Sequence, residues 1–154
     1  MHEEMKKWLE ETLKDPLVSI LLKNSNLTKI QFESVLIDLA AENLSTNRLK
    51  YEDKAKMRID NVSRGAFNRS LNQARKNIIS AIYTVLLLSY VGLFKGPPFD
   101  DYEILAEKLR EYTSLYRTYS KEGLEAQSNL LYKIERELFE GIESLAKPRR
   151  LKVV

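Results

Sequence analysis

The sequence contains no cysteine and a single histidine. Without cysteine the chain cannot form a disulfide or a thiolate metal site, and His2 alone cannot complete a zinc ligand set or a histidine-based catalytic arrangement. Glycine and proline are scarce, at 5 and 4 residues, which argues against a turn-rich β protein and favours long helices. No Gly-rich phosphate loop is present either. We therefore expect an all-α protein that is not an enzyme and has no catalytic residue, metal or cofactor.

Long hydrophobic runs are also few, and the longest covers residues 78–94 without a charge. A membrane-spanning helix needs about 20 predominantly apolar residues, and this run is shorter and includes Ser80, Thr84 and Ser89. We interpret it as a buried central helix, with a membrane span as the alternative. The N-terminus lacks an apolar segment behind a basic start, so no signal peptide is predicted and the expected location is cytoplasmic.

Positive charge is present in small excess and is unevenly distributed. The 25 basic and 22 acidic residues leave a net charge of +3. Residues 1–47 carry a net −3, residues 48–76 a net +6, and residues 77–154 a net zero. A basic excess concentrated in 29 residues indicates a polyanionic partner, most often nucleic acid.

Apolar periodicity and capping residues predict helices along the whole chain and no strand. Short helices are expected over 3–14 and 17–22, the second opened by Pro16. Asn26 is the expected N-cap of the next helix, which runs to about residue 44. Its apolar positions are Ile30, Phe32, Val35, Leu36, Leu39 and Ala40. Residues 45–47 are interpreted as a turn.

The C-terminal part of the sequence predicts a helical hairpin over 99–146. A helix starting near Asp100 places apolar and tyrosine residues at alternating spacings of three and four, typical of a heptad seam. After a turn at 120–123, a second helix covers 124–146. The seam either packs against this helix or pairs two copies. Its residues are Tyr102, Leu105, Leu109, Tyr112, Tyr116 and Tyr119. Domains of 1–98 and 99–146 follow, with a basic tail at 147–154.

The basic segment itself predicts a helix over 50–58, a turn at 59–62, and a long helix capped by Ser63. On that long helix Phe67, Leu71, Ala74 and Ile78 share one side. The other sides carry basic and amide side chains with no acid: Arg64, Asn68, Arg69, Asn72, Gln73, Arg75 and Lys76. Arg and Lys bind phosphate or guanine, and Asn and Gln can pair with adenine in the major groove.

These residues resemble a known pattern, the helix-turn-helix of sigma-factor region 4, over residues 50–76. The similar stretches are 51–55, 62–67 and 71–76, with an alanine in the first helix and Val-Ser at the start of the second. The resemblance implies that Ala55 lies where the two helices cross and that Phe67 and Leu71 anchor the core. It also implies that Arg64, Asn68, Arg69 and Asn72 face DNA.

The resulting hypothesis is a DNA-binding transcriptional regulator whose helix 63–78 enters the major groove. The expected partners are duplex DNA and a second copy of the chain, with no membrane. The alternatives are a helical assembly subunit that binds RNA or single-stranded DNA without reading its sequence, and a protein–protein adaptor. The candidate contacts are Lys54, Lys56, Ser63, Arg64, Asn68, Arg69, Asn72, Gln73, Arg75 and Lys76.

Overall fold

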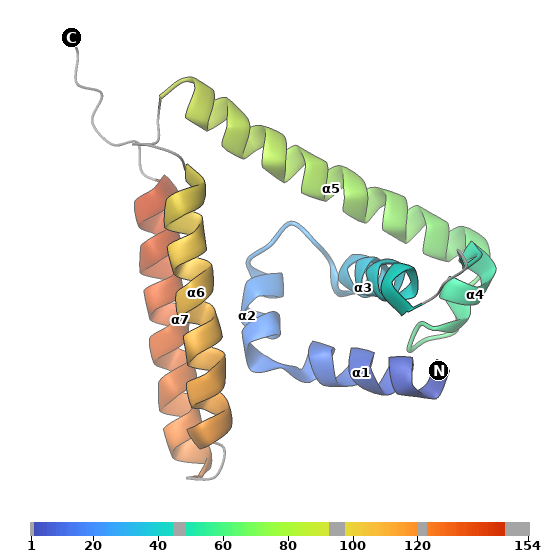
Figure 1. Ribbon diagram of the computed structural model, residues 1–154, viewed down its shortest axis with the longest axis horizontal. Coiled ribbons are helices and arrows are strands. Elements are labelled where there is room, and N and C mark those ends of the chain that lie inside the picture. The colour runs from blue at the N-terminus through green and yellow to red at the C-terminus, as the bar shows by residue number, and fades with distance from the viewer. Residues whose placement is uncertain (1, 45–48, 93–97, 120–122, 147–154) are drawn as a thin grey trace. The chain divides into compact units, whose positions relative to one another are not determined.

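The computed structural model describes residues 2–44, 49–92, 98–119 and 123–146, and α-helix is the only regular secondary structure in these ranges, as predicted (Figure 1). The chain divides into two compact units, Met1–Ile82 and Tyr83–Val154. The expected turn at 45–47, most of the turn at 120–123 and the basic tail lie outside the described residues. The helices are α1 (His2–Lys14), α2 (Pro16–Lys23), α3 (Lys29–Leu44), α4 (Tyr51–Lys56), α5 (Arg64–Tyr90), α6 (Pro98–Tyr119) and α7 (Leu124–Ala146).

The first unit is built around side chains from α1, α3, α4 and the first half of α5, residues 64–77. Ala55 of α4 and Phe67 and Leu71 of α5 are buried together in this core, so the expected core positions on these two helices are confirmed. The ring of Tyr51 contacts Phe67 with 6.4 Å between centroids. The other buried members of the core are Met5, Leu9, Ile37 and Met57.

The starts of α2 and α3 are capped by side chains. Asp15 Oδ1 accepts a hydrogen bond of 2.8 Å from the Leu17 amide, and Pro16 occupies the first turn of α2, as predicted. At α3 the cap is Thr28, which corrects the expectation for Asn26. Thr28 Oγ1 accepts from the Gln31 amide, and Gln31 Oε1 accepts from the Thr28 amide, the reciprocal pair of a capping box.

Asn26 instead ties the loop before α3 to α5. Its side-chain amide donates to the backbone oxygen of Asn77 at 3.0 Å, and the Asn77 amide group donates back to the Asn26 backbone oxygen at 3.0 Å. Asn77 also donates to Gln31 Oε1 at 3.2 Å. This reciprocal pair secures the middle of α5 to the start of α3.

The buried side of α3 is more polar than the sequence predicts. Ile30 and Leu39, two of the expected apolar positions, are exposed, while Ile37 and Ala41 are buried. The same buried side carries charged and hydroxyl groups, namely Glu33, Ser34 and Asp38. Apolar residues occur nearly all around this helix, so its periodicity does not select one side. The buried side of α3 is set instead by the positive side chains of α4 and the segment after it, which pair with the acids of α3.

α5 is one helix of 27 residues, and its two halves have opposite relations to solvent. Phe67, Leu71 and Ala74 are buried in the first half. The second half, residues 78–90, was expected to be buried, but its large side chains are mostly exposed, and Tyr90 is 90% exposed. The expectation of a buried central helix is therefore wrong for this half. Within the described ranges, no helix is long and apolar enough to cross a membrane.

In the second unit, α6 and α7 lie side by side as an antiparallel hairpin (Figure 1). Ile134 and Leu138 of α7 are buried. Gly141 faces α6, because a Cβ at this position would lie 3.4 Å from Leu105 Cδ1. The described seam side chains of α6 are half-buried, namely Leu105, Leu109, Tyr112 and Tyr116, which supports a seam within the chain. The side chains of Tyr102 and Tyr119 lie outside the described residues.

Candidate nucleic-acid interface

The predicted start of the long helix is confirmed at Ser63. Ser63 Oγ accepts a hydrogen bond of 3.1 Å from the Ala66 amide, and the Phe67 amide bonds to the Ser63 carbonyl at 3.0 Å. An N-cap side chain satisfies one of the amides that a helix start otherwise leaves unpaired. Phe67 then enters the core, so the opposite side of the first turns faces solvent.

That outward side forms what we call the polar face: Arg64, Asn68, Arg69, Asn72, Gln73 and Lys76. All are exposed except Asn68, which is half-buried. Among the described residues, no carboxylate pairs with Arg64, Arg69 or Lys76, and α5 itself contains no acidic residue. The three cations therefore keep their full charge available to a ligand.

The amide side chains of the polar face are ordered along the helix. Asn72 Nδ2 donates to Asn68 Oδ1 at 3.3 Å, and Gln73 Nε2 donates to Asn77 Oδ1 at 3.1 Å. Each pair spans one helical turn, and such pairs add a few tenths of a kcal/mol to a helix. The contacts hold the amide groups on the helix surface, and each group keeps further donor and acceptor positions open.

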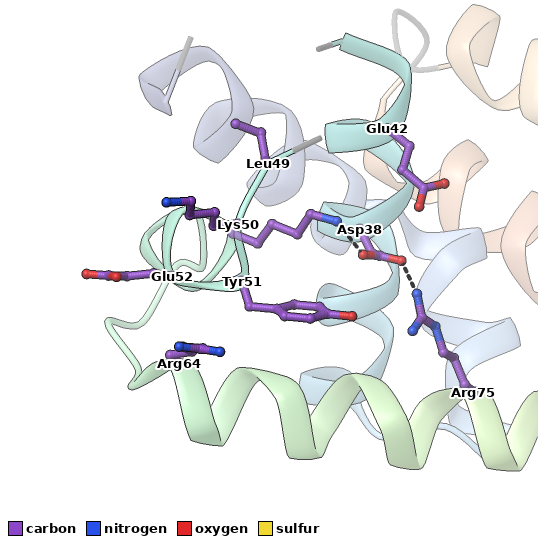
Figure 2. A pocket seen from close by; sticks show the side chains of 9 residues that line it. Asp38, Glu42, Leu49, Lys50, Tyr51, Glu52, Arg64 and Arg75 are labelled. Carbon is purple, nitrogen blue, oxygen red and sulfur yellow. Dashed lines mark hydrogen bonds and ion pairs between the residues drawn. The ribbon is translucent and has the colours of Figure 1, made fainter. Parts of the chain in front are cut away.

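Two of the predicted nucleic-acid contacts, Lys54 and Arg75, instead pair with an acid of the protein itself. Lys54 is buried, and its Nζ lies 2.7 Å from Asp38 Oδ1. The second oxygen of Asp38 accepts a bond of 2.6 Å from Arg75 Nη2 (Figure 2). Lys54 also lies over the Tyr51 ring, 5.7 Å from its centroid. The prediction of a surface role for Lys54 is therefore wrong, because a buried carboxylate needs a countercharge.

Arg75 differs from Lys54 because its side chain is 46% exposed. Burial lowers the pKa of its guanidinium, but a hydrogen bond to the Tyr51 side chain and the charge of Asp38 raise that pKa above its ordinary value. Figure 2 shows the Tyr51 hydroxyl end turned toward Arg75. One nitrogen of the Arg75 guanidinium, Nη2, thus binds Asp38, while the rest of the side chain is partly exposed to solvent.

A second internal pair joins α3 to the segment after α4. Arg58 Nη2 lies 3.1 Å from Glu33 Oε2, and both side chains are buried. The other oxygen of Glu33 accepts a bond of 2.7 Å from the Ile59 amide. This pair positions the turn between α4 and α5. Glu33 and Asp38 were not among the predicted functional residues, although both acids are next to apolar residues in the α3 sequence.

These contacts redistribute the charge of the basic segment. Glu33 and Asp38 belong to the acidic first third of the sequence, yet they neutralise Lys54 and Arg58 from the basic segment. Lys56 stays exposed, 3.7 Å from the exposed Glu52. The positive charge that the basic segment presents at the surface is therefore smaller than the sequence count. On α5, only Arg75 among the four cations pairs with a described carboxylate.

A partly open cavity of about 290 Å³ adjoins the start of the polar face (Figure 2). Its wall combines the Asp38 network with side chains from 49–52 and with Arg64. Both acidic and basic side chains line it, so the cavity carries no strong charge of one sign. The lining residues are Asp38, Glu42, Leu49, Lys50, Tyr51, Glu52, Lys54, Arg64 and Arg75.

No cluster of potential metal ligands occurs among the residues that the structure describes. Comparisons with protein-family models, with curated proteins and with solved structures found no match to this chain.

Proposed function

We propose that this protein binds nucleic acid, with duplex DNA as the favoured form, through the polar face of α5. The observation that carries the proposal is a helix half whose buried side is fixed in a core while its exposed side holds three unpaired cations and no acid. Such a surface suits a phosphate backbone, which binds cations in a salt-dependent way. A transcriptional regulator acting in the cytoplasm is the role that we propose for it.

The residues of the polar face make two kinds of contact in this proposal, to phosphates and to base edges. Arg64 and Lys76 bind phosphates at the two ends of the polar face. Arg69 and Asn72 lie between them and contact base edges, since Arg pairs with guanine and Asn with adenine. Lys54 has no part in this proposal, because it is buried. If two copies act together, their two α5 helices bind half-sites about one DNA turn, or about 34 Å, apart.

The test is fluorescence anisotropy of a labelled duplex, titrated with the full chain at several salt concentrations. Arg69→Ala with Lys76→Ala should weaken binding at least about tenfold and, through the lost phosphate contact of Lys76, make the slope of log K against log salt shallower by about 1. The matched control is Lys23→Ala with Lys29→Ala, which removes the same charge from exposed positions outside α5. An unchanged slope in the first variant, or an equal loss in the second, contradicts the proposal.

The same titrations separate the alternative functions. A single strand that competes better than the duplex of the same sequence would favour an assembly subunit that tracks the backbone. No retention on a polyanion column at moderate salt would favour a protein–protein adaptor instead.

A further inference from the structure

Arg75 lies at the edge of α5, between the buried side of the helix and the polar face. At about 100° per residue, it falls within about 20° of Arg64 and of Asn68, two members of that face. Its side chain is 46% exposed, whereas the side chains of Lys54 and Asp38, the other charged members of its network, are 4% and 9% exposed. A ligand outside the protein can therefore reach this charged network through Arg75.

Two side chains fix the position of the Arg75 guanidinium. Asp38 Oδ2 accepts a bond of 2.6 Å from Arg75 Nη2. The guanidinium also bonds to the Tyr51 side chain, whose hydroxyl end is turned toward it (Figure 2). Tyr51 is itself held by the contact of its ring with Phe67 in the core. A long side chain that would otherwise sample many rotamers is thus held from two helices, α3 and α4.

The network holds Arg75 without occupying all of its donors. A guanidinium has more N–H groups than these two bonds use, so donors remain for a ligand. Asp38 also binds Lys54 Nζ through its other oxygen, at 2.7 Å. Because two cations share one carboxylate, the three groups together keep a positive charge. Lys54 is too deeply buried to contact a phosphate, so the phosphate contact of this network depends on Arg75.

We propose that Arg75 is a further phosphate contact of the bound duplex, and that Asp38 and Tyr51 are positioning residues that hold its guanidinium beside the polar face. A side chain that is already held in place loses less conformational freedom when it binds. The planar guanidinium suits a phosphate, because two of its N–H groups can bond to two phosphate oxygens. With Arg64, about 16 Å away along the helix axis, Arg75 extends the phosphate contacts along one edge of α5.

This inference rests on the proposed function, because it adds a contact to the same bound duplex. It fails separately if Arg69→Ala with Lys76→Ala weakens binding and Arg75→Ala does not. A wild-type protein that binds no duplex overturns both proposals.

The first test repeats the duplex titrations at several salt concentrations with Arg75→Ala. Asp38 keeps Lys54 as its partner in this variant, and circular dichroism verifies that the variant folds. We expect binding to weaken about five- to tenfold and the slope of log K against log salt to become shallower by about 1. Arg75→Lys keeps the charge and should restore the slope. The matched control Lys23→Ala removes one exposed charge outside α5 and should leave the slope unchanged.

Tyr51→Phe tests the positioning. It removes the hydroxyl group, keeps the ring that contacts Phe67 and leaves the charge of the protein unchanged. We expect the affinity to fall about two- to fivefold with an unchanged slope, because Arg75 still reaches the phosphate but has lost one of the bonds that hold it. The matched control Tyr132→Phe removes the hydroxyl of a tyrosine of α7 that is 69% exposed, and should leave the affinity unchanged.

Nuclear magnetic resonance of the free protein measures the positioning without nucleic acid. The heteronuclear NOE of the Arg75 Nε–Hε group, assigned by its loss in Arg75→Lys, should exceed that of the exposed Arg69 and should fall in Tyr51→Phe. A network with only a structural role would give the ordered Arg75 signal but no change of slope in Arg75→Ala, and that result overturns the proposal. An Arg75 as mobile as Arg69, or an equal change of slope in Lys23→Ala, also overturns it.

Discussion

At the scale of single residues, Asp38 has the greatest influence on which cations of this protein are available. It lies on α3 and binds Lys54 of α4 with one oxygen and Arg75 of α5 with the other. One buried acid thus joins three helices and withdraws one lysine entirely, and one arginine in part, from the surface. On α5 the pairing reduces the charge available to a ligand at Arg75 alone, since no described carboxylate pairs with Arg64, Arg69 or Lys76.

We expect Asp38→Ala to lower the free energy of unfolding by about 3–5 kcal/mol, because it leaves the Lys54 ammonium buried without a countercharge. Lys54→Met should cost less, since Asp38 keeps Arg75 as a partner. Urea unfolding measures both. Glu10→Ala, which removes an exposed 3.7 Å pair with Lys14, is the control and should stay within about 0.5 kcal/mol of the wild type. An Asp38→Ala variant as stable as this control would contradict the role assigned to Asp38.

The buried and exposed lysines of the basic segment give a prediction for binding. Lys76→Ala and Lys54→Met each remove one positive charge, but only Lys76 lies on the surface. Lys76→Ala should make the salt dependence of duplex binding shallower by about 1, while Lys54→Met leaves it unchanged. Anisotropy titrations at several salt concentrations measure both slopes. Equal changes of the two slopes would mean that binding depends on the net charge of the protein and not on the position of the charged side chain.

At the scale of elements, α5 combines a first half with a polar exposed side and a second half with an apolar exposed side. The first half is stabilised by the Ser63 cap and by Phe67 and Leu71 in the core. A single glycine, Gly65, interrupts its first turn. Its backbone has no positive φ, and the atom nearest to an added Cβ would be Arg69 Nη1 at 3.8 Å.

Gly65→Ala should therefore raise the free energy of unfolding by about 0.4–1 kcal/mol, because alanine restricts the unfolded chain and fits the helix without a clash. Thermal unfolding measures the gain. Ser63→Ala, which removes the cap bond to Ala66, should act in the opposite direction by about 1 kcal/mol. A loss of stability on Gly65→Ala would show that this position requires a glycine backbone.

At the scale of the whole molecule, the two compact units have separate buried residues. The only tryptophan, Trp8, belongs to the first unit, which permits one unit to be followed alone. Ile134 is fully buried in the hairpin of the second unit. Units with their own cores can unfold as separate cooperative units.

We expect Ile134→Ala to destabilise the hairpin by about 2–4 kcal/mol, since it leaves a cavity in a buried position. The loss of helicity by circular dichroism should then begin at lower urea, while the transition reported by Trp8 fluorescence stays in place. Phe67→Ala should give the reverse, moving the Trp8 transition. Both probes moving together in either variant, at the same protein concentration, would mean that the chain unfolds as one unit.

Much of the helical pattern could be predicted because its causes are local. Apolar spacing over a few turns predicts α5, α6 and α7, and the Ser63 hydroxyl is close enough in sequence to cap α5. The positions of Phe67 and Leu71 on one side of α5 follow from the helical repeat. The polar face follows from the same repeat, because it is the side away from those residues.

By itself, then, the sequence determined the all-helical fold, most helix boundaries and the outward side of the first half of α5. Only the tertiary structure decided that α3 buries Glu33 and Asp38, that Lys54 is unavailable to a ligand, and that the second half of α5 is exposed. The physical reason is distance along the chain. Asp38 lies 16 residues from Lys54 and 37 from Arg75. Burial and charge pairing depend on which of these distant groups come into contact. Helical periodicity reports only on residues a few positions apart, so it cannot predict those contacts.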